Sequence, residues 1–456
     1  MVYLHVPFCR SFCTYCDFYS EIACRGRDAQ QFEAFTAAVC DEISRRRDEI
    51  EATRDLNTLY IGGGTPSVLP PICLRQIVAA LLSSEGVPPK TPASLRSETS
   101  RQQIDGARAL WRAERKLVFR QTCPKNNFRP TARPFTEFTV EVNPEDIVEQ
   151  GEAYVRELLE LGVNRISMGV QSLDDGILRW MNRRHDAARA RQAFRILRDA
   201  GVENISVDLI FGLSQLSAQT LSATLSELLS WGPEHISAYQ LSIEEGSALG
   251  RMVLEGRYHE ASQEQCADQY RQICDALRAA GFVHYEISNW ARPGREALHN
   301  SAYWSRHPYV GLGPGAHSFH DRTRSWNDCA LTLSNPHRFA EPPMKGATPF
   351  TSVPGGDSVA ATFSESLADT PSRRLVAPSL RSYANQAAEQ LTDIEVREEE
   401  IMLGLRTARG IPESLLPPGV AAPLLADGRL VRLNGGRVRI PEDRWFISDD
   451  IIAELI

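Results

Sequence analysis

The segment Cys9-Arg-Ser-Phe-Cys13-Thr-Tyr-Cys16 lies near the amino end of the chain, shortly after the apolar run Val2-Tyr-Leu-His-Val6. Thiolates are soft ligands that suit iron–sulfur clusters, and three cysteines on one short loop can reach three corners of a cubic cluster. A [4Fe–4S] cube has four irons, so three thiolates leave one iron with an open coordination position. An open position can accept an exchangeable ligand, as it does in catalytic metal sites.

Zinc binding and plain burial are the two alternatives for this loop. Structural zinc needs a fourth nearby Cys or His and usually uses CxxC pairs. His5 is close in sequence but lies within the expected strand at 2–6. The CxxxCxxC spacing favours a cluster over zinc and leaves both open. Burial as a small apolar residue is the default for the other seven cysteines, which are Cys24, Cys40, Cys73, Cys123, Cys266, Cys274 and Cys329.

The composition is typical of an ordinary globular protein, with 42% hydrophobic and 24% charged residues. A net charge of -8 gives no reason to expect a nucleic-acid partner. No apolar run reaches the roughly 18–20 residues that span a bilayer, and no signal peptide is recognisable, so at most peripheral membrane association is expected. We expect a reducing compartment: the cytoplasm, or the mitochondrion if the source is eukaryotic and the amino terminus incomplete.

Short apolar runs alternate with amphipathic stretches from residue 1 to about 240. Repeated strand-then-helix units predict parallel βα units, with functional loops at the carboxyl ends of the strands. The expected strands are residues 2–6, 58–61, 137–142, 165–168, 205–210 and 236–239. The expected helices are residues 30–47, 72–82, 153–161, 187–200 and 221–229.

Two segments interrupt this pattern. Residues 87–134, rich in proline and arginine, are interpreted as a surface insertion, and residues 341–377 as a flexible linker or insertion. After the linker, a helix is expected at 398–407 and a hairpin around Asn434-Gly435-Gly436. This pattern predicts a small winged-helix-like α+β module that packs against the rest of the protein.

A second motif, Gly62-Gly63-Gly64-Thr65-Pro66-Ser67, follows the second expected strand. Glycines at a strand end let the backbone approach a ligand closely. A glycine turn alone is weak evidence, because any tight βα turn can use one. Its position one strand after the cysteine loop gives it weight.

The two motifs together resemble the radical S-adenosylmethionine (S-adenosyl-L-methionine, SAM) superfamily. Within it the chain is similar to the branch that contains oxygen-independent coproporphyrinogen III oxidase and, most closely, the heme chaperone HemW. Further matching phrases are Tyr3-Leu-His-Val-Pro-Phe-Cys9, Glu141-Val-Asn-Pro144, Asp208-Leu-Ile-Phe-Gly-Leu213, Tyr285-Glu-Ile-Ser-Asn289 and His299-Asn-Ser-Ala-Tyr-Trp304.

The resemblance implies an α/β fold: a partial (β/α)6 TIM-type radical SAM barrel with the small carboxyl-terminal module. The corresponding domains are a core barrel at 1–240, an extension at 241–340 that carries the HNxxYW motif, the linker at 341–377, and a HemW-like domain at 378–456. Polar residues at strand ends, such as Glu141, Gln171 and Asp208, could equally be strand-end, cap or turn residues.

The resemblance also implies site residues. The cluster ligands are Cys9, Cys13 and Cys16, and SAM's methionine amino and carboxylate groups chelate the open iron. Heme, as bound cargo, would contact His299, Tyr303 and Trp304. The positions that match SAM contacts are Tyr3, Tyr15, Gly63, Gly64, Thr65, Glu141, Gln171, Arg183 and Asp208.

Two functions remain open at this stage. One is a heme chaperone, with an unidentified heme-accepting protein and an electron donor as partners. The other is the oxidase of porphyrin biosynthesis. The oxidases of this branch have the motif CxxxCxxCxC and an amino-terminal arm ahead of the first strand. Here Phe18 stands at the extra cysteine position and no such arm is seen, while the HNxxYW motif is present. These features favour the chaperone, and whether the protein is an enzyme is left undecided.

Overall fold

The structure of the chain is a computed structural model, and it describes residues 1–23, 28–83, 134–244, 246–328 and 386–456. The insertion expected at 87–134, apart from Pro134, and the linker expected at 341–377 lie outside the described residues.

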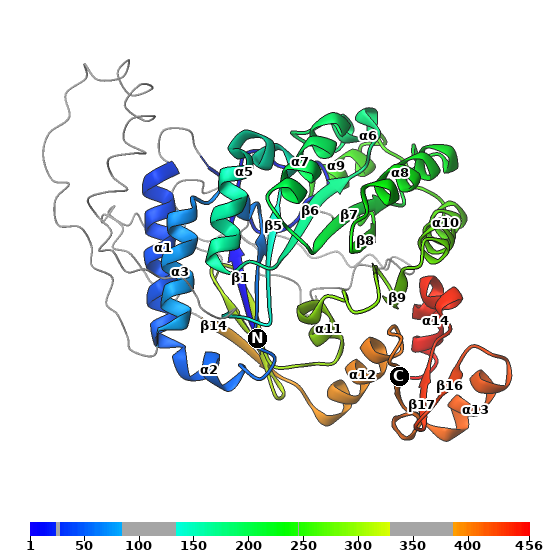
Figure 1. The fold of residues 1–456 in the computed structure, drawn as a ribbon. Coiled ribbons are helices and arrows are strands. Elements are labelled where there is room, and N and C mark those ends of the chain that lie inside the picture. The colour runs from blue at the N-terminus through cyan, green and yellow to red at the C-terminus, as the bar shows by residue number, and fades with distance from the viewer. Residues whose placement is uncertain (24–27, 84–133, 245, 329–385) are drawn as a thin grey trace, which may run out of the picture.

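The core is a twisted sheet of parallel strands with helices on its outer face (Figure 1). All six expected strands are confirmed and neighbour one another in chain order, as the predicted βα units require. Their bounds are β1 (Val2–Val6), β4 (Thr58–Gly63), β5 (Glu137–Val142), β6 (Arg165–Gln171), β7 (Ile205–Phe211) and β8 (His235–Gln240).

The segment after β8 extends this sheet at both edges. β11 (Val310–Leu312) pairs in parallel with β1 at one edge, and β10 (Asn289–Ala291) pairs antiparallel with β8 at the other. β9 (Val283–Glu286) lies outside β10. Residues 283–312 are therefore joined to the barrel by strand pairing, which their sequence did not reveal.

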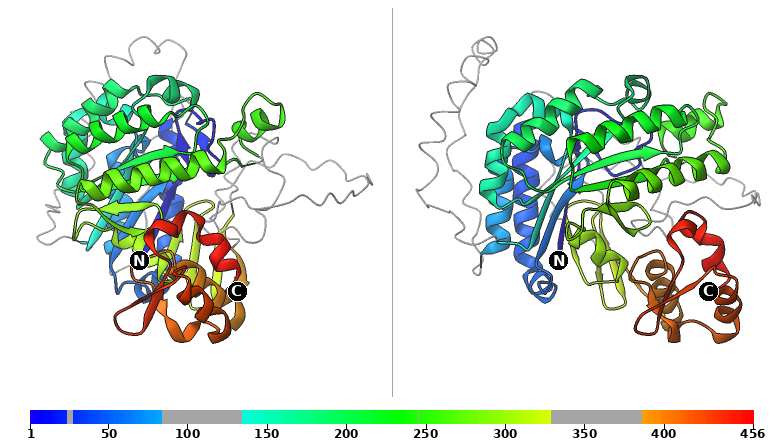
Figure 2. Two further views of the ribbon diagram at one scale, coloured as in Figure 1. Left: turned by 90° about the vertical axis from the view of Figure 1, so that its right-hand side faces the viewer. Right: turned by 45° about the vertical axis from the view of Figure 1, so that its right-hand side comes forward.

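Helices cover the outer face of the sheet (Figures 1 and 2). The five expected helices exist with modest differences in their bounds. The helix expected at 153–161 is the second part of α5, which extends back to Pro144 through a break at Gly151, whose φ of 71° is not helical. Asn143 caps the first part, its side chain accepting from the backbone N–H of Glu145 at 3.2 Å. The main helices are α1 (Asp28–Arg45), α3 (Pro71–Leu82), α5 (Pro144–Leu161), α7 (Ala187–Asp199), α8 (Ala218–Trp231) and α10 (Gln263–Ala279).

Shorter elements complete the barrel part. The short helices are α2 (Arg47–Ala52), α6 (Asp175–Trp180), α9 (Ala248–Leu254) and α11 (Leu298–Trp304). The short strands are β2 (Phe8–Cys9), β3 (Glu21–Ile22), β12 (His317–His320), β13 (Thr323–Asn327) and β14 (Gln386–Gln390).

Side chains along each barrel strand alternate in character. In β5, Phe138 and Val140 are fully buried in the hydrophobic core beneath the helices, whereas Thr139 and Glu141 are the polar residues that alternate with them. Because successive strand residues point to opposite faces, the alternation gives the barrel an apolar outside, covered by helices, and a polar inside. We call this polar inside the lumen.

The carboxyl-terminal module has its own hydrophobic core, centred on Leu405, Leu424 and Trp445. The expected hairpin is confirmed, with Gly435 and Gly436 at positive φ in its turn. The helix expected at 398–407 begins earlier, after the Thr392 capping box, and ends at Gly404. The elements are α12 (Asp393–Gly404), β15 (Ile411–Pro412), α13 (Pro418–Ala426), β16 (Val431–Leu433), β17 (Arg437–Arg439) and α14 (Ser448–Ala453).

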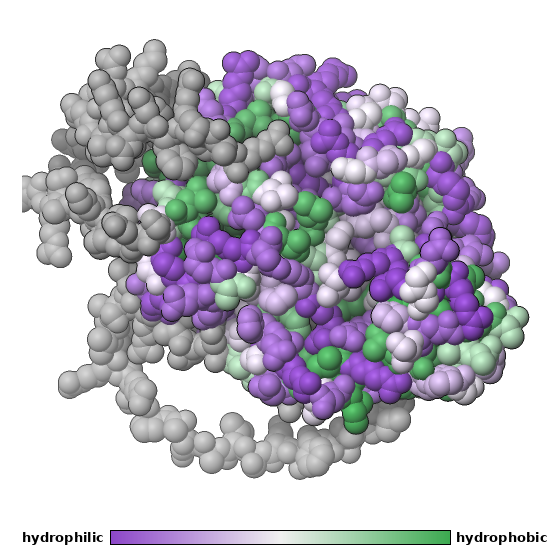
Figure 3. All heavy atoms as spheres, turned by 60° about the horizontal axis from the view of Figure 1, so that its bottom comes forward, coloured by the Kyte–Doolittle hydropathy of each residue, from purple (hydrophilic) through white to green (hydrophobic). Residues whose placement is uncertain are grey.

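This module packs against the edge of the sheet at β9 and against α10, near α11 (Figures 1 and 2), and the N–H of Ala408 donates to Tyr285 O at 2.9 Å. The Phe446 ring lies 5.1 Å from that of Tyr270, and Arg306 forms a salt bridge of 3.0 Å with Glu399 on α12. The outer surface at the bottom of the view of Figure 1, where the module lies, mixes hydrophilic and hydrophobic side chains (Figure 3). Among the described residues, no helix has the length and apolar character that crossing a membrane demands.

Candidate iron–sulfur and SAM site

The cysteine loop is held from both sides at the carboxyl end of the barrel. The backbone N–H of Thr14 donates to Met181 O at 3.1 Å, and its hydroxyl donates to Trp180 O at 2.8 Å. On the other side, the N–H of Leu249, at the start of α9, donates to Thr14 O at 2.9 Å. The loop therefore has a fixed path between α6 and α9.

The three cysteines of this loop are the candidate cluster ligands. Cys9, Cys13 and Cys16 are free thiols, and Cys9 is buried. Burial raises the pKa of Cys9, and burial together with the nearby Cys13 raises the pKa of Cys16 to about 12. Iron would have to displace these protons, as metals do when they bind thiols. No three Cys, His, Asp or Glu side chains of the described chain surround a single ion position, and a cube does not require this, because each thiolate binds a different iron.

A positive charge lies against this loop. The Arg183 guanidinium donates to Cys13 Sγ at 3.3 Å and to Gly169 O at 2.9 Å. It also interacts with the Tyr15 hydroxyl. A guanidinium in this position would offset part of the negative charge of a bound cluster.

The glycine motif runs along the cysteine loop. The N–H groups of Gly64 and Thr65 donate to Val6 O and Phe8 O, both at 2.8 Å. A Cβ on Gly64 would lie 2.8 Å from Phe8 O and 3.0 Å from Cys9 Sγ, too close for any side chain. The Thr65 hydroxyl also approaches Cys9 Sγ at 3.5 Å. Gly64 is therefore needed where the motif touches the cluster loop.

Gly63 is constrained by the protein itself. Its φ is 110°, and a Cβ there would lie 2.7 Å from His5 Nδ1. The sequence-based reason for these glycines was room for a ligand. In the structure, glycine is required at position 63 because β4 approaches β1 too closely there for a Cβ.

Glu141, at the end of β5, accepts two hydrogen bonds in the lumen. The Tyr60 hydroxyl donates to Oε1 at 2.7 Å, and the N–H of Gly63 donates to Oε2 at 3.2 Å. Burial nevertheless raises the pKa of Glu141 to about 7. Burial also raises the pKa of Asp208, which accepts from Ser167 Oγ at 3.0 Å. Two carboxyl groups that accept hydrogen bonds thus line the lumen.

Gln171 lies beside Arg183. Its backbone has a positive φ of 66°, at a register shift between β6 and β7. A Cβ on Gly169 would lie 2.8 Å from the Gln171 amide nitrogen and 3.3 Å from an Arg183 nitrogen. Tyr3 lies in β1, and its hydroxyl is 3.1 Å from His5 Nδ1. The structure thus places the nine expected SAM residues around the cysteine loop and the adjoining lumen.

The expected heme residues lie elsewhere. α11 is at the opposite, amino-terminal end of the barrel (Figure 1). His299 has no exposed surface, and its ring nitrogens lie 2.9 Å from Thr58 Oγ1 and 3.0 Å from the Tyr303 hydroxyl. Trp304 is 7% exposed. Iron ligation by His299 would require the ring to give up one of these bonds.

The sequence did not single out Tyr60 or Arg165, although both lie in the lumen. Arg165 is 1% exposed, and its Nε and Nη1 atoms have no hydrogen-bond partner among the described residues. The strand alternation of polar and apolar residues would have found both.

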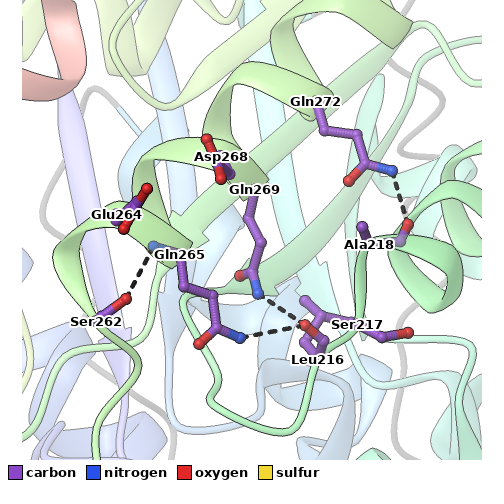
Figure 4. Close-up of a pocket in the computed structure, with 9 residues that line it drawn as sticks. All are labelled: Leu216, Ser217, Ala218, Ser262, Glu264, Gln265, Asp268, Gln269 and Gln272. Carbon is purple, nitrogen blue, oxygen red and sulfur yellow. Dashed lines mark hydrogen bonds between the residues drawn. The ribbon is translucent and has the colours of Figure 1, made fainter.

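A surface pocket of about 320 Å³ lies between α8 and α10, away from these residues (Figure 4). Gln269 fixes its wall, donating to Leu216 O at 2.8 Å and accepting from the N–H of Gly212 at 2.7 Å. These bonds anchor the loop after β7, the strand that carries Asp208.

The parallel barrel and the cysteine loop with its glycine partner define a radical SAM protein, and residues 3–228 match the family model described as the radical SAM superfamily. The chain is 31% identical over 325 residues to the heme chaperone HemW of Bacillus subtilis (strain 168), an alignment that covers 71% of this chain and 72% of the relative. It is 28% identical over 460 residues to the heme chaperone HemW of Mycobacterium tuberculosis (strain H37Rv), covering 100% and 94%. The chain belongs to the HemW family.

The fold has a solved counterpart in the coproporphyrinogen III oxidase HemN of Escherichia coli, a radical SAM enzyme. The TM-score is 0.64 at 15% identity, covering 99% of this chain and 89% of that one. This likeness shows the shared fold.

Ionisation of Glu141 gives a testable pH dependence in the ligand-free protein. Its pKa is about 7 in the folded state and 4.5 ordinarily, so the folded state binds more protons between these values. Stability should fall as the pH rises through this window, by roughly 3 kcal/mol from this group. Glu141→Gln should remove that slope, measured by urea unfolding from pH 5 to 8.

The stability of Glu141→Gln is compared with that of the wild type at each pH. Glu286 also has a raised pKa of about 7, and its contribution is present in both proteins. Parallel curves for wild type and Glu141→Gln would show that Glu141 is not protonated in this range.

Proposed function

We propose that this protein is a heme chaperone that carries one [4Fe–4S] cluster, binds SAM, and hands heme to an acceptor protein. Its membership of the HemW family carries this proposal, since relatives matched over 71% and 100% of this chain are named heme chaperones. The acceptor and an electron donor are expected partners, and cytoplasm or mitochondrion is the expected location.

In this proposal Cys9, Cys13 and Cys16 hold the cluster, and Arg183 offsets its negative charge. The cluster would supply an iron with an open position for SAM. Glu141 and Asp208 would accept hydrogen bonds from ammonium or hydroxyl groups of SAM, as carboxylates do. The remaining proposed SAM contacts are Tyr3, Tyr15, Gly63, Gly64, Thr65 and Gln171.

Phe18 supports the chaperone over the oxidase. It stands at the position where the oxidases have a further cysteine, and its side chain is 65% exposed beside the cysteine loop. A phenyl ring provides no ligand and no thiol. The heme contacts expected at His299, Tyr303 and Trp304 stay a prediction, with the condition that His299 must release a hydrogen bond.

The test is anaerobic reconstitution followed by two parallel assays. We expect heme titration to give a saturable Soret band at about one heme per chain, and incubation with coproporphyrinogen III, SAM and reductant to leave the substrate unchanged. Conversion to protoporphyrinogen IX, with methionine and 5′-deoxyadenosine released in step, would instead make the protein an oxidase.

A further inference from the structure

α11 closes the amino-terminal end of the lumen through fixed bonds. The Glu137 carboxylate, on the first residue of β5, accepts from the backbone N–H groups of Leu298 at 2.8 Å and His299 at 2.9 Å. A carboxylate at a helix start satisfies N–H groups that have no partner within the helix. The position of α11 is therefore set by the barrel.

His299 is the residue of α11 that joins the lumen side chains. One ring nitrogen bonds Thr58 Oγ1 on β4, and the other bonds the Tyr303 hydroxyl one helical turn further on. Burial lowers the pKa of His299 well below its ordinary value, so the ring is neutral, with one donor and one acceptor nitrogen. Both partners are hydroxyl groups, each of which can donate to the unprotonated ring nitrogen or accept from the protonated one.

Tyr60 connects His299 to Glu141. The Tyr60 and His299 rings have centroids 5.2 Å apart with planes 33° apart. Tyr60 lies two residues after Thr58 on β4, so both side chains point into the lumen. Its hydroxyl donates to Glu141 Oε1 at 2.7 Å. His299 thus holds Thr58 by a hydrogen bond and contacts the ring of Tyr60.

We propose that His299 is a positioning residue for the SAM site: it fixes Tyr60, and Tyr60 orients the Glu141 carboxylate. The proposal rests on the proposed assignment of Glu141 to SAM. It gives the histidine of the HNxxYW motif a role that needs no bond to iron. Both ring nitrogens of His299 are already hydrogen-bonded within the protein, to Thr58 and Tyr303.

The pKa of Glu141 is a measure of the contacts that run from His299 through Tyr60. The ionisable groups that influence it come from every neighbouring element of the lumen. They are Tyr3 on β1, Tyr60 on β4, Arg165 on β6, Asp208 on β7, Tyr239 on β8 and Tyr303 on α11. Of these, Tyr60 donates directly to the carboxylate and favours its ionised form. Loss of that donor raises the pKa of Glu141.

The experiment measures SAM affinity of the cluster-loaded protein by titration calorimetry across pH. We expect His299→Leu and Tyr60→Phe each to weaken SAM binding about tenfold, the size of one hydrogen bond to a charged group. Because both act on one carboxylate, the double variant should bind no more weakly than either single variant. The pH midpoint of binding should move upward in both, and His299→Gln, which can donate and accept, should restore part of the affinity.

His284→Leu is the matched control, since His284 is also buried but stacks on Trp290 at 4.2 Å, near the carboxyl-terminal module. Its affinity and midpoint should equal those of the wild type. Unchanged affinity and midpoint in His299→Leu, or additive losses in the double variant, would overturn the proposal. If His299→Leu does not fold, Thr58→Val and Tyr60→Phe carry the same test.

Heme titration of the same variants separates this proposal from the proposed function. A positioning role requires that His299→Leu weaken SAM binding whether or not its heme spectrum changes, whereas a changed heme spectrum with normal SAM binding would make His299 a heme ligand alone and refute the positioning role. Failure of the wild type to bind heme would refute the chaperone function and leave the SAM measurements valid.

Discussion

Replacing Cys13 by Ser is expected to abolish assembly of the [4Fe–4S] cluster. Cys13 supplies one of three thiolates on a single loop, and its sulfur accepts a hydrogen bond from Arg183 at 3.3 Å. A serine hydroxyl is a hard, weakly acidic ligand that iron–sulfur clusters rarely use. Iron and sulfide content, together with the broad visible absorbance after reconstitution, should fall to background, and Cys9→Ser and Cys16→Ser should do the same.

The controls are Cys266→Ser and Cys274→Ser. Both cysteines are buried on α10 and are free thiols, so they test the loss of a thiol away from the loop. They should assemble the cluster at the wild-type level. A normal cluster in Cys13→Ser would refute the assignment of the loop, and loss of the cluster in Cys274→Ser alone would point to a ligand on α10.

Replacing Gly64 by Val should also prevent cluster assembly, although no ligand is removed. A Cβ at this position would lie 3.0 Å from Cys9 Sγ and 2.8 Å from Phe8 O. The Phe8 carbonyl cannot move away cheaply, because it accepts from the N–H of Thr65 at 2.8 Å. The Cys9 thiol must therefore shift from its position in the loop. Iron content after reconstitution measures the effect, and Gly64→Ala should show a smaller loss.

Gly419→Ala is the matched control for losing a glycine. Gly419 lies in α13, and a Cβ there meets nothing within 4 Å. This variant should keep the wild-type cluster content and, since alanine favours helix, should unfold at an equal or higher temperature. Full cluster content in Gly64→Val would show that the glycine motif is a tight turn independent of the cluster.

The two ends of the barrel have different expected roles. The cysteine loop, the glycine motif and Arg183 gather at the carboxyl end, while α11 and the carboxyl-terminal module meet at the other. Arg306, two residues after α11, is bonded to Glu399 of the module. α11 is thus fixed to the lumen through His299 and to the module through the residues that follow it.

The sequence by itself determined the repeated βα units. All six strands were predicted because short stretches with recurring apolar residues, such as Val2–Val6 and Glu137–Val142, are local patterns, and their alternation with helices implies parallel order. The hairpin at Gly435 and Gly436 was equally local, because a tight turn needs positive φ at its centre. Three cysteines within eight residues likewise need no distant partner to suggest a cluster.

Tertiary structure alone decided which residues that are distant in the chain meet inside the barrel. The position of His299 inside the lumen depends on Thr58, 241 residues away, and on Glu137, which holds the start of α11. The need for glycine at Gly64 comes from Cys9, on another strand. Such contacts join residues that are distant in the chain, and their geometry follows from how the strands pack side by side. A local pattern can therefore name the cluster ligands, whereas the environment of His299 and the ionisation of Glu141 arise only when the barrel closes around them.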